Sequence, residues 1–311
     1  MLKYIIKRIL NLFPVMLGMS FIIFSIMALT PGDPALLILG ESTTPEALHA
    51  LREEMRLNDP FYVQYFRYIF NALQGDFGTS YSSRTPVLTE IFIRFPVTLT
   101  LAIASLIFSV VIGIPLGILS AVKQYSIVDN ISLGAALLLA SIPGFWLGLM
   151  LILFFSLRLG WFPAIGLTSI RHVVLPTITM SALGLATMIR MTRSSMLEVI
   201  RQDFIRTARA KGATERRVIW RHALQNAFLP IITVAGLTFG MQLGGAVITE
   251  SVFAIPGVGT LMINAVRSND NPMVMASVLF IAFFVCAVNL LVDILYVFID
   301  PRIRTQYDKK R

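Results

Sequence analysis

The chain has 311 residues, of which 56% are hydrophobic and only 14% are charged. Soluble domains carry about 25% charged residues, so this composition argues against a soluble protein and predicts one that spans a membrane. The net charge of +9 does not indicate nucleic-acid binding, because the basic residues are sorted by loop, and the single cysteine, Cys286, excludes an intrachain disulfide.

Six apolar segments are long enough to cross the hydrocarbon core of a bilayer, which takes about 20 residues. They cover residues 9–29, 97–121, 132–157, 173–192, 228–250 and 274–299. The first follows Lys3, Lys7 and Arg8 as a signal peptide would, but its apolar run is too long and no cleavage site follows, so we expect a retained span. The sequence therefore predicts an all-α membrane protein with six transmembrane helices.

The distribution of Lys and Arg between the loops predicts the orientation of these helices. With the N-terminus in the cytoplasm, the inner segments hold 18 of the 26 basic residues and the outer segments hold 8. The positive-inside rule then places both termini in the cytoplasm. We expect four parts, which are the N-terminus and first helix (1–30), an extracytoplasmic segment (31–95), a five-helix core (96–300) and a cytoplasmic tail (301–311).

The extracytoplasmic segment contains helical patterns of its own. Thr44 precedes a proline and early acids, which are signals for the start of a helix. In the next run, residues 61–70, aromatic residues recur at helical spacing and place Tyr62, Tyr65, Phe66 and Ile69 on one face. These patterns predict a small helical cap packed on the membrane surface, with contact to a substrate-delivering protein as the alternative.

Within the apolar segments, glycines and prolines indicate how the helices pack. Gly236, Gly240 and Gly244 recur every four residues, which predicts a ridge that another helix approaches closely or that lines a pathway. Prolines at positions 115, 143 and 176 predict kinks. Asp293 is a candidate functional residue because it lies inside the last segment, but near Arg302 and Arg304 we favour a structural ion pair or helix cap.

One charged stretch, residues 190–221, interrupts the apolar sequence with nine Lys or Arg and three acids. Each charge at the centre of a membrane costs roughly 2.5–3.5 kcal/mol, so this stretch must project from the bilayer. A short basic projection between two spans is where a membrane protein would meet a cytoplasmic partner. We interpret Arg190 and Arg193, which are close to the bilayer, as residues that only fix the topology.

The usual signatures of catalysis are missing from the sequence. It contains no Gly-Lys dipeptide and hence no P-loop, and it contains no HExxH, no GxSxG and no paired metal-binding cysteines. The spans hold too few ionisable groups for a proton relay, so uphill transport would draw its energy from a separate ATPase. We predict a non-catalytic subunit with no metal and no cofactor of its own.

The charged stretch resembles a known motif. Residues 204–212 (FIRTARAKG), followed by HALQNA at 222–227 and by Pro230, resemble the EAA loop of binding-protein-dependent ABC importers. More narrowly, the chain resembles the B-type permease subunit of the dipeptide, oligopeptide and nickel branch. Four further motifs occur in the order of that family: LTPGDP at 29–34, GDFGTS at 75–80, VFAIPGVG at 252–259 and DPRIR at 300–304.

This resemblance implies a type I ABC importer permease fold and a division of labour. Two homologous permeases would form the pathway, two cytoplasmic ATPases would bind ATP and Mg, and an extracytoplasmic solute-binding protein would deliver cargo at a bacterial or archaeal cytoplasmic membrane. The ATPases would dock on a coupling loop, residues 193–227. The coupling residues that the resemblance implies are Arg206, Thr207, Ala208, Arg209, Ala210, Lys211, Gly212, Ala213, Asn226 and Pro230.

These residue types suit such a role physically. Gly212 tolerates the left-handed backbone angles of a turn that leaves a helix. The alanines permit close seating in a groove, and the basic side chains reach acids on a partner or anionic lipid headgroups. The motif departs from the broader family at residues 206–208, where RTA replaces EAA, and at residues 224–225, where LQ replaces LP, and the peptide and nickel branch commonly shows both changes.

The resemblance implies a di- or oligopeptide as the cargo, with glutathione, nickel complexes and oligosaccharides as alternatives. A membrane scaffold or sensor whose basic loop recruits another partner is the competing function.

Overall fold

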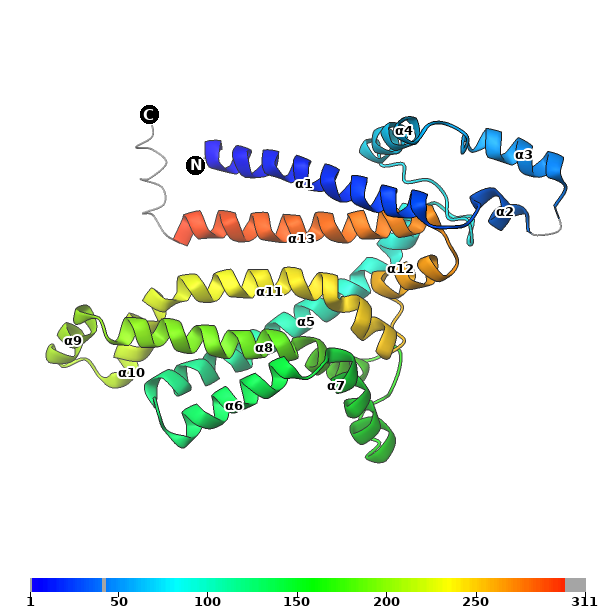
Figure 1. The fold of residues 1–311 in the computed structure, drawn as a ribbon. Coiled ribbons are helices and arrows are strands. Elements are labelled where there is room, and N and C mark those ends of the chain that lie inside the picture. Colours follow the sequence, from blue (N-terminus) through cyan, green and yellow to red (C-terminus); the bar gives the residue numbers. More distant parts are fainter. Residues whose placement is uncertain (1, 41–42, 300–311) are drawn as a thin grey trace.

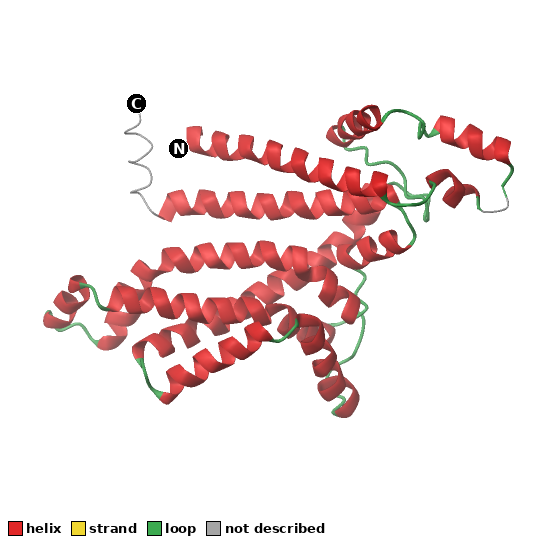
Figure 2. Ribbon diagram, in the orientation of Figure 1, coloured by secondary structure: helices red, strands yellow, loops and turns green. Residues whose placement is uncertain are grey.

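The computed structural model describes residues 2–40 and 43–299. In this part of the chain the regular elements are helices joined by loops, as Figure 2 shows. The predicted cytoplasmic tail and the whole DPRIR motif lie outside the described residues. Five helices are long and apolar enough to cross a membrane: α1 (Leu2–Leu29), α5 (Val87–Val122), α8 (Ile170–Ile200), α11 (Leu224–Val252) and α13 (Asn271–Ile299).

The third predicted span, 132–157, is a broken pair of helices. Helix α6 (Ile127–Ser141) is followed by α7 (Gly144–Leu151) and a π-helical segment, η1 (Ile152–Arg158), at an angle of 102°. Pro143 causes the break, because the residue before a proline is driven out of the α-helical region, and Ile142 is extended with ψ +125°. The kink predicted at Pro143 is therefore present as a sharp break between two helices. Counted as one broken span, the pair raises the total to the six that the sequence predicted.

The other two prolines for which we predicted kinks do not end their helices. Helix α5 continues through Pro115, and α8 continues through Pro176. Neighbouring helices and local adjustments satisfy the freed backbone groups of such prolines in membrane helices.

The helices form a bundle with two distinct ends (Figure 1). At one end lie the start of α1, the end of α13 and the loop that carries α9 (Asp203–Ala210) and α10 (Glu215–Arg217). At the opposite end lie α12 (Val258–Arg267) and three short helices, α2 (Pro34–Leu39), α3 (Pro45–Glu54) and α4 (Phe61–Leu73). We call these the loop end and the cap end. Their arrangement agrees with a topology in which the chain enters and leaves on the side of the basic stretch.

The centre of the bundle is the packing of α8 against α5 and α11, with α13 on the other side of α11 and α1 against α13. Glycines allow the closest approaches. A side chain at Gly113 or Gly117 of α5 would collide with Met188 or Thr192 of α8. The two helices are therefore held at a distance that only a glycine permits on the α5 side.

Two of the three glycines in the predicted ridge on α11 face α13. A Cβ at Gly236 would collide with Val292 of α13, and one at Gly240 would lie 3.5 Å from Val285 of the same helix. Gly244 is exposed, and no atom lies within 4 Å of its would-be Cβ. The ridge therefore serves the packing of α13 at its first two positions, whereas Gly244 is open within this chain.

The cap packs against α1 through aromatic rings. Thr44 caps α3 as predicted, since its hydroxyl accepts a hydrogen bond from the Ala47 amide at 3.4 Å. On α4, the ring of Tyr65 lies 5.5 Å from that of Phe24 in α1. Tyr62 and Phe66, from the same predicted face, are each more than 60% exposed within this chain.

The membrane acid Asp293 forms an ion pair, which is one of the two structural roles that we favoured for it. Its carboxylate lies 2.9 Å from the guanidinium of Arg8 in α1. The predicted neighbours Arg302 and Arg304 lie outside the described residues. The ion pair joins the first and last long helices near the loop end.

Candidate functional site: the basic loop

The basic loop, which we define as residues 201–223, connects the two central helices α8 and α11 at the loop end (Figure 1). Helix α9 follows the end of α8 after a short turn. Helix α10 then continues without interruption into a π-helical segment, η2 (Val218–Ala223), and into α11. The predicted coupling loop, 193–227, therefore includes the last turns of α8 and the first turn of α11. A displacement of the loop acts directly on both helices.

Helix α9 ends in a Schellman motif around Gly212. The amide of Gly212 donates to the carbonyl of Arg209 at 2.9 Å, and the amide of Ala213 donates to the carbonyl of Ala208 at 3.2 Å. This pairing requires a left-handed residue at the first position after the helix. Gly212 has φ +81°, as the prediction of a turn required.

Buried apolar side chains hold the loop against the bundle. Ile205 of α9 and Val218 of η2 are both fully buried and belong to the same apolar cluster as Met196 near the end of α8. Ala208 and Ala213 pack partly against this cluster, while Ala210 is exposed. We had assigned all three alanines to close contact with a partner's groove. The packing of Ala208 and Ala213 against this cluster explains their small size without a partner.

The charged side chains of the loop divide into an internal pair and an outward group. Arg209 donates to Glu215 through Nε at 2.7 Å and through Nη2 at 3.2 Å, and these hydrogen bonds raise the pKa of the guanidinium. The pair joins the end of α9 to the start of α10 across the Gly212 turn. Arg206 is 76% exposed and lies 3.7 Å from the exposed Asp203, and Lys211 is also exposed.

The remaining predicted coupling residues have local roles. The Thr207 hydroxyl donates to the carbonyl of Asp203 at 3.0 Å, which closes a turn of α9. The Asn226 amide donates to the carbonyl of His222 at 2.7 Å. Pro230 lies inside α11 and is exposed. The structure thus brings residues 206–213 together at the end of α9 and in the turn that follows it. Asn226 and Pro230 lie apart from them, on α11.

A buried ion pair lies at the loop end next to the basic loop, and the sequence did not predict it. Arg193 of α8 donates to both carboxylate oxygens of Asp129, at 2.7 and 2.9 Å. Asp129 is 1% exposed and also accepts from Ser120 at 2.5 Å and from the Tyr125 amide at 2.9 Å. The interpretation of Arg193 as a topology residue only was wrong, because it ties α8 to the first turn of α6.

A second buried acid, Glu250, organises the cap end. Its carboxylate accepts a hydrogen bond from the Thr98 hydroxyl of α5 at 2.6 Å and another from the Thr260 amide of α12 at 3.0 Å. A side chain at Gly257 or Gly259 would collide with this carboxylate. The glycines of the VFAIPGVG motif therefore make room for Glu250, which stands just before the motif and which we did not single out from the sequence.

Within the described residues, no group of three or more His, Cys, Asp or Glu side chains is placed to hold a metal ion. The exposed charged side chains of the basic loop are mostly cations, with Asp203 and Glu215 as exposed acids, and such a surface suits contact with a partner.

Comparison with known families decides where this architecture belongs. Residues 113–305 match the family model of the binding-protein-dependent transport system inner membrane component, and residues 1–102 match the model of the N-terminal part of such components. The chain belongs to this permease family.

Curated relatives cover nearly the whole permease. The dipeptide transport system permease protein DppB of Alkalihalophilus pseudofirmus is 41% identical over 332 aligned residues, which cover 98% of this chain and 100% of that protein. The glutathione transport system permease protein GsiC of Escherichia coli K12 is 42% identical over 304 residues, with 98% and 99% covered. The permease is therefore a subunit of an ABC importer in the same branch, as the sequence predicted.

A solved structure supports the fold. The permease matches a chain of the inward-facing MetNI methionine ABC transporter with a TM-score of 0.58 at 23% identity, over 68% of this chain and 97% of that chain. A second crystal form of the same transporter gives a TM-score of 0.57 at 22% identity. The permease thus has the type I importer fold and is a multi-pass protein of the inner membrane.

Proposed function

We propose that this permease imports di- or oligopeptides and that its basic loop receives the work of ATP hydrolysis from partner ATPases. The observation that carries the proposal is the construction of α9, which has a buried apolar side, a fixed end at Gly212 and an outward basic surface. An eight-residue helix is not stable alone in water, so its order comes from its packing on the bundle. Such a helix transmits force because it cannot move independently of α8 and α11.

The proposed assembly contains this permease, a second homologous permease, two ABC ATPases that bind ATP and Mg, and an extracytoplasmic solute-binding protein. It would reside in a bacterial or archaeal cytoplasmic membrane. The names of the relatives support peptide cargo, since one is a dipeptide permease and the other a permease for glutathione, which is itself a small peptide. Nickel complexes and oligosaccharides have no comparable support.

Replacement of Gly212 tests the coupling role, with a matched control in the same chain. Gly212 and Gly75 have nearly the same φ, +81° and +82°, and no atom lies within 4 Å of either would-be Cβ. Asp tolerates left-handed angles better than most residues, so Gly212→Asp and Gly75→Asp impose a similar small strain. We expect both variants to reach the membrane, and only Gly212→Asp to abolish peptide uptake.

The readouts are the amount of permease in isolated membranes and the uptake of radiolabelled dialanine into proteoliposomes of the complete transporter. Wild-type uptake by Gly212→Asp would defeat the coupling role. Uptake of glutathione but not dialanine by the wild type would replace the proposed cargo by the alternative. Co-purification of ATPases and a second permease distinguishes this function from a scaffold or sensor, which would bring down neither.

A further inference from the structure

A cavity of about 370 Å³ opens at the cap end between α5, the end of α11 and α12. Its volume is within the range of small-molecule sites, roughly 300–1,000 Å³. The basic loop lies at the other end of the bundle, so the proposed coupling machinery does not use this cavity. Its polar lining consists of Arg94 from α5, Ser251 from α11, and Thr260, Asn264 and Arg267 from α12.

The pattern of α12 fixes this polar lining in place. Thr260, Asn264 and Arg267 follow one another at intervals of four and three residues, so they share one face of the helix. The opposite face carries Val258 and Leu261, which are buried in the apolar core beneath the cap. Helix α12 cannot rotate to turn the polar face away without exposing this apolar face.

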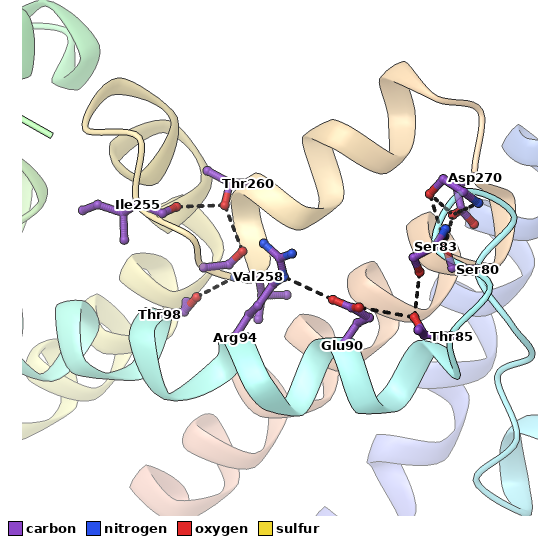
Figure 3. A network of polar contacts seen from close by, with 12 residues as sticks. Ser80, Ser83, Thr85, Glu90, Arg94, Thr98, Ile255, Val258, Thr260 and Asp270 are labelled. Carbon is purple, nitrogen blue, oxygen red and sulfur yellow. Dashed lines mark hydrogen bonds and ion pairs between the residues drawn. The ribbon is translucent and has the colours of Figure 1, made fainter. Parts of the chain in front are cut away.

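The charge of the cavity is positive. Arg94 extends from α5 toward α12 (Figure 3) and has Glu90 as a neighbour at 3.5 Å, which is a long distance for an ion pair and offsets the charge only in part. Within the part of the chain that the structure describes, Arg267 has no ion-pair partner, and no lining residue of the cavity is an acid. The nearby Glu250 is fully buried and is not part of the lining, and its oxygens accept hydrogen bonds from Thr98 and from the Thr260 amide.

We propose that this cavity binds the carboxylate of an incoming peptide through Arg94 and Arg267 before the peptide enters the bundle. A guanidinium matches a carboxylate with two parallel hydrogen bonds. The amide of Asn264 and the hydroxyl of Ser251 supply the donors and acceptors that a peptide backbone needs. This inference rests on the proposed peptide function, and it predicts that peptides with a free carboxylate are preferred to their amides.

The test uses the purified transporter in lipid nanodiscs, without its solute-binding protein. Phenylglyoxal, which modifies arginine, is added alone, with dialanine, or with dialanine amide, and modified residues are quantified by mass spectrometry. We expect dialanine to slow the modification of Arg94 and Arg267 several-fold and dialanine amide to leave it unchanged. The exposed Arg84 at the same end is the internal control and should react equally in all samples.

A second arm replaces Arg267 by Gln and measures dialanine uptake in proteoliposomes. We expect the apparent KM to rise about tenfold, the lower range for loss of a hydrogen bond to a charged group, with little change in the maximal rate. An unchanged KM together with equal modification in all samples would overturn the inference. The inference would also be overturned if cargo-free binding protein, and not dialanine, slowed the modification of Arg94 and Arg267. The two arginines would then form ion pairs with acids of the binding protein.

The two proposals fail separately in these experiments. If the wild type imports dialanine but the peptide protects neither arginine, the carboxylate site is wrong and the peptide importer stands. If dialanine protects the arginines but is not imported, the proposed cargo is wrong and the site stands.

Discussion

Truncation of Ile205, the buried side chain of α9, tests whether apolar packing holds the basic loop against the bundle. Ile205 is fully buried, whereas its neighbour Phe204 is 44% exposed. Truncation of a buried isoleucine to alanine costs about 2–5 kcal/mol. Because α9 has little stability of its own, we expect Ile205→Ala to lower the free energy of local opening of the loop by this amount while the membrane helices stay folded.

Hydrogen exchange measures this opening directly. A loss of about 2–5 kcal/mol corresponds to a rise in amide exchange of roughly thirtyfold to several thousandfold, because each 1.36 kcal/mol is a factor of ten. We expect this rise in peptides that cover residues 203–213, and uptake should fall with it. Phe204→Ala removes an exposed apolar group from the same helix and should leave exchange unchanged. Wild-type exchange in Ile205→Ala, or equal loss in Phe204→Ala, would refute this account of α9.

Two further predictions concern the bundle. Asp129→Ala should destabilise the purified permease by about 3–5 kcal/mol, because it leaves the guanidinium of Arg193 buried without its partner, and thermal unfolding should show that the double variant with Arg193→Met recovers most of the loss. A double variant as unstable as the single one would contradict this. Gly236→Ala should lower the unfolding temperature, since overpacking against Val292 costs about 1–3 kcal/mol, whereas Gly244→Ala should have no such effect in the isolated subunit. Equal effects of the two alanines would show that the packing of α13 is not the reason for the first glycine.

The features predicted best from the sequence were those that depend on local pattern. Apolar length located the spans, and a helix-start signal located Thr44. The turn at Gly212 was predicted because only a few residue types accept its backbone angles. At Pro143 the sequence predicted a kink but not the sharp break, because a proline within an apolar run is compatible with either, and the packing around it decides between them. Pro115, which kept its helix, shows the other outcome.

The long-range polar pairs were not predictable in the same way. Asp129 and Arg193 are 64 residues apart, and Thr98 and Glu250 are 152 apart. No periodicity in one segment indicates its partner in another. The acids themselves were a usable signal, because a carboxylate within or beside an apolar segment needs a partner. Asp293 was singled out on that ground, but nothing in its own segment indicated that it would pair with Arg8 of the first helix.

The two arms that lead into the basic loop differ in stiffness. Helix α8 runs without interruption for 31 residues to the loop, while the returning arm begins with the π-helical η2 before α11 becomes regular. A π-helical turn has one surplus residue and looser hydrogen bonding, so it shortens or lengthens more readily than an α-helical turn. We therefore expect a displacement of α9 to move α8 as a rigid body. The π-helical η2 should deform instead, so that α11 can change its angle independently of α8.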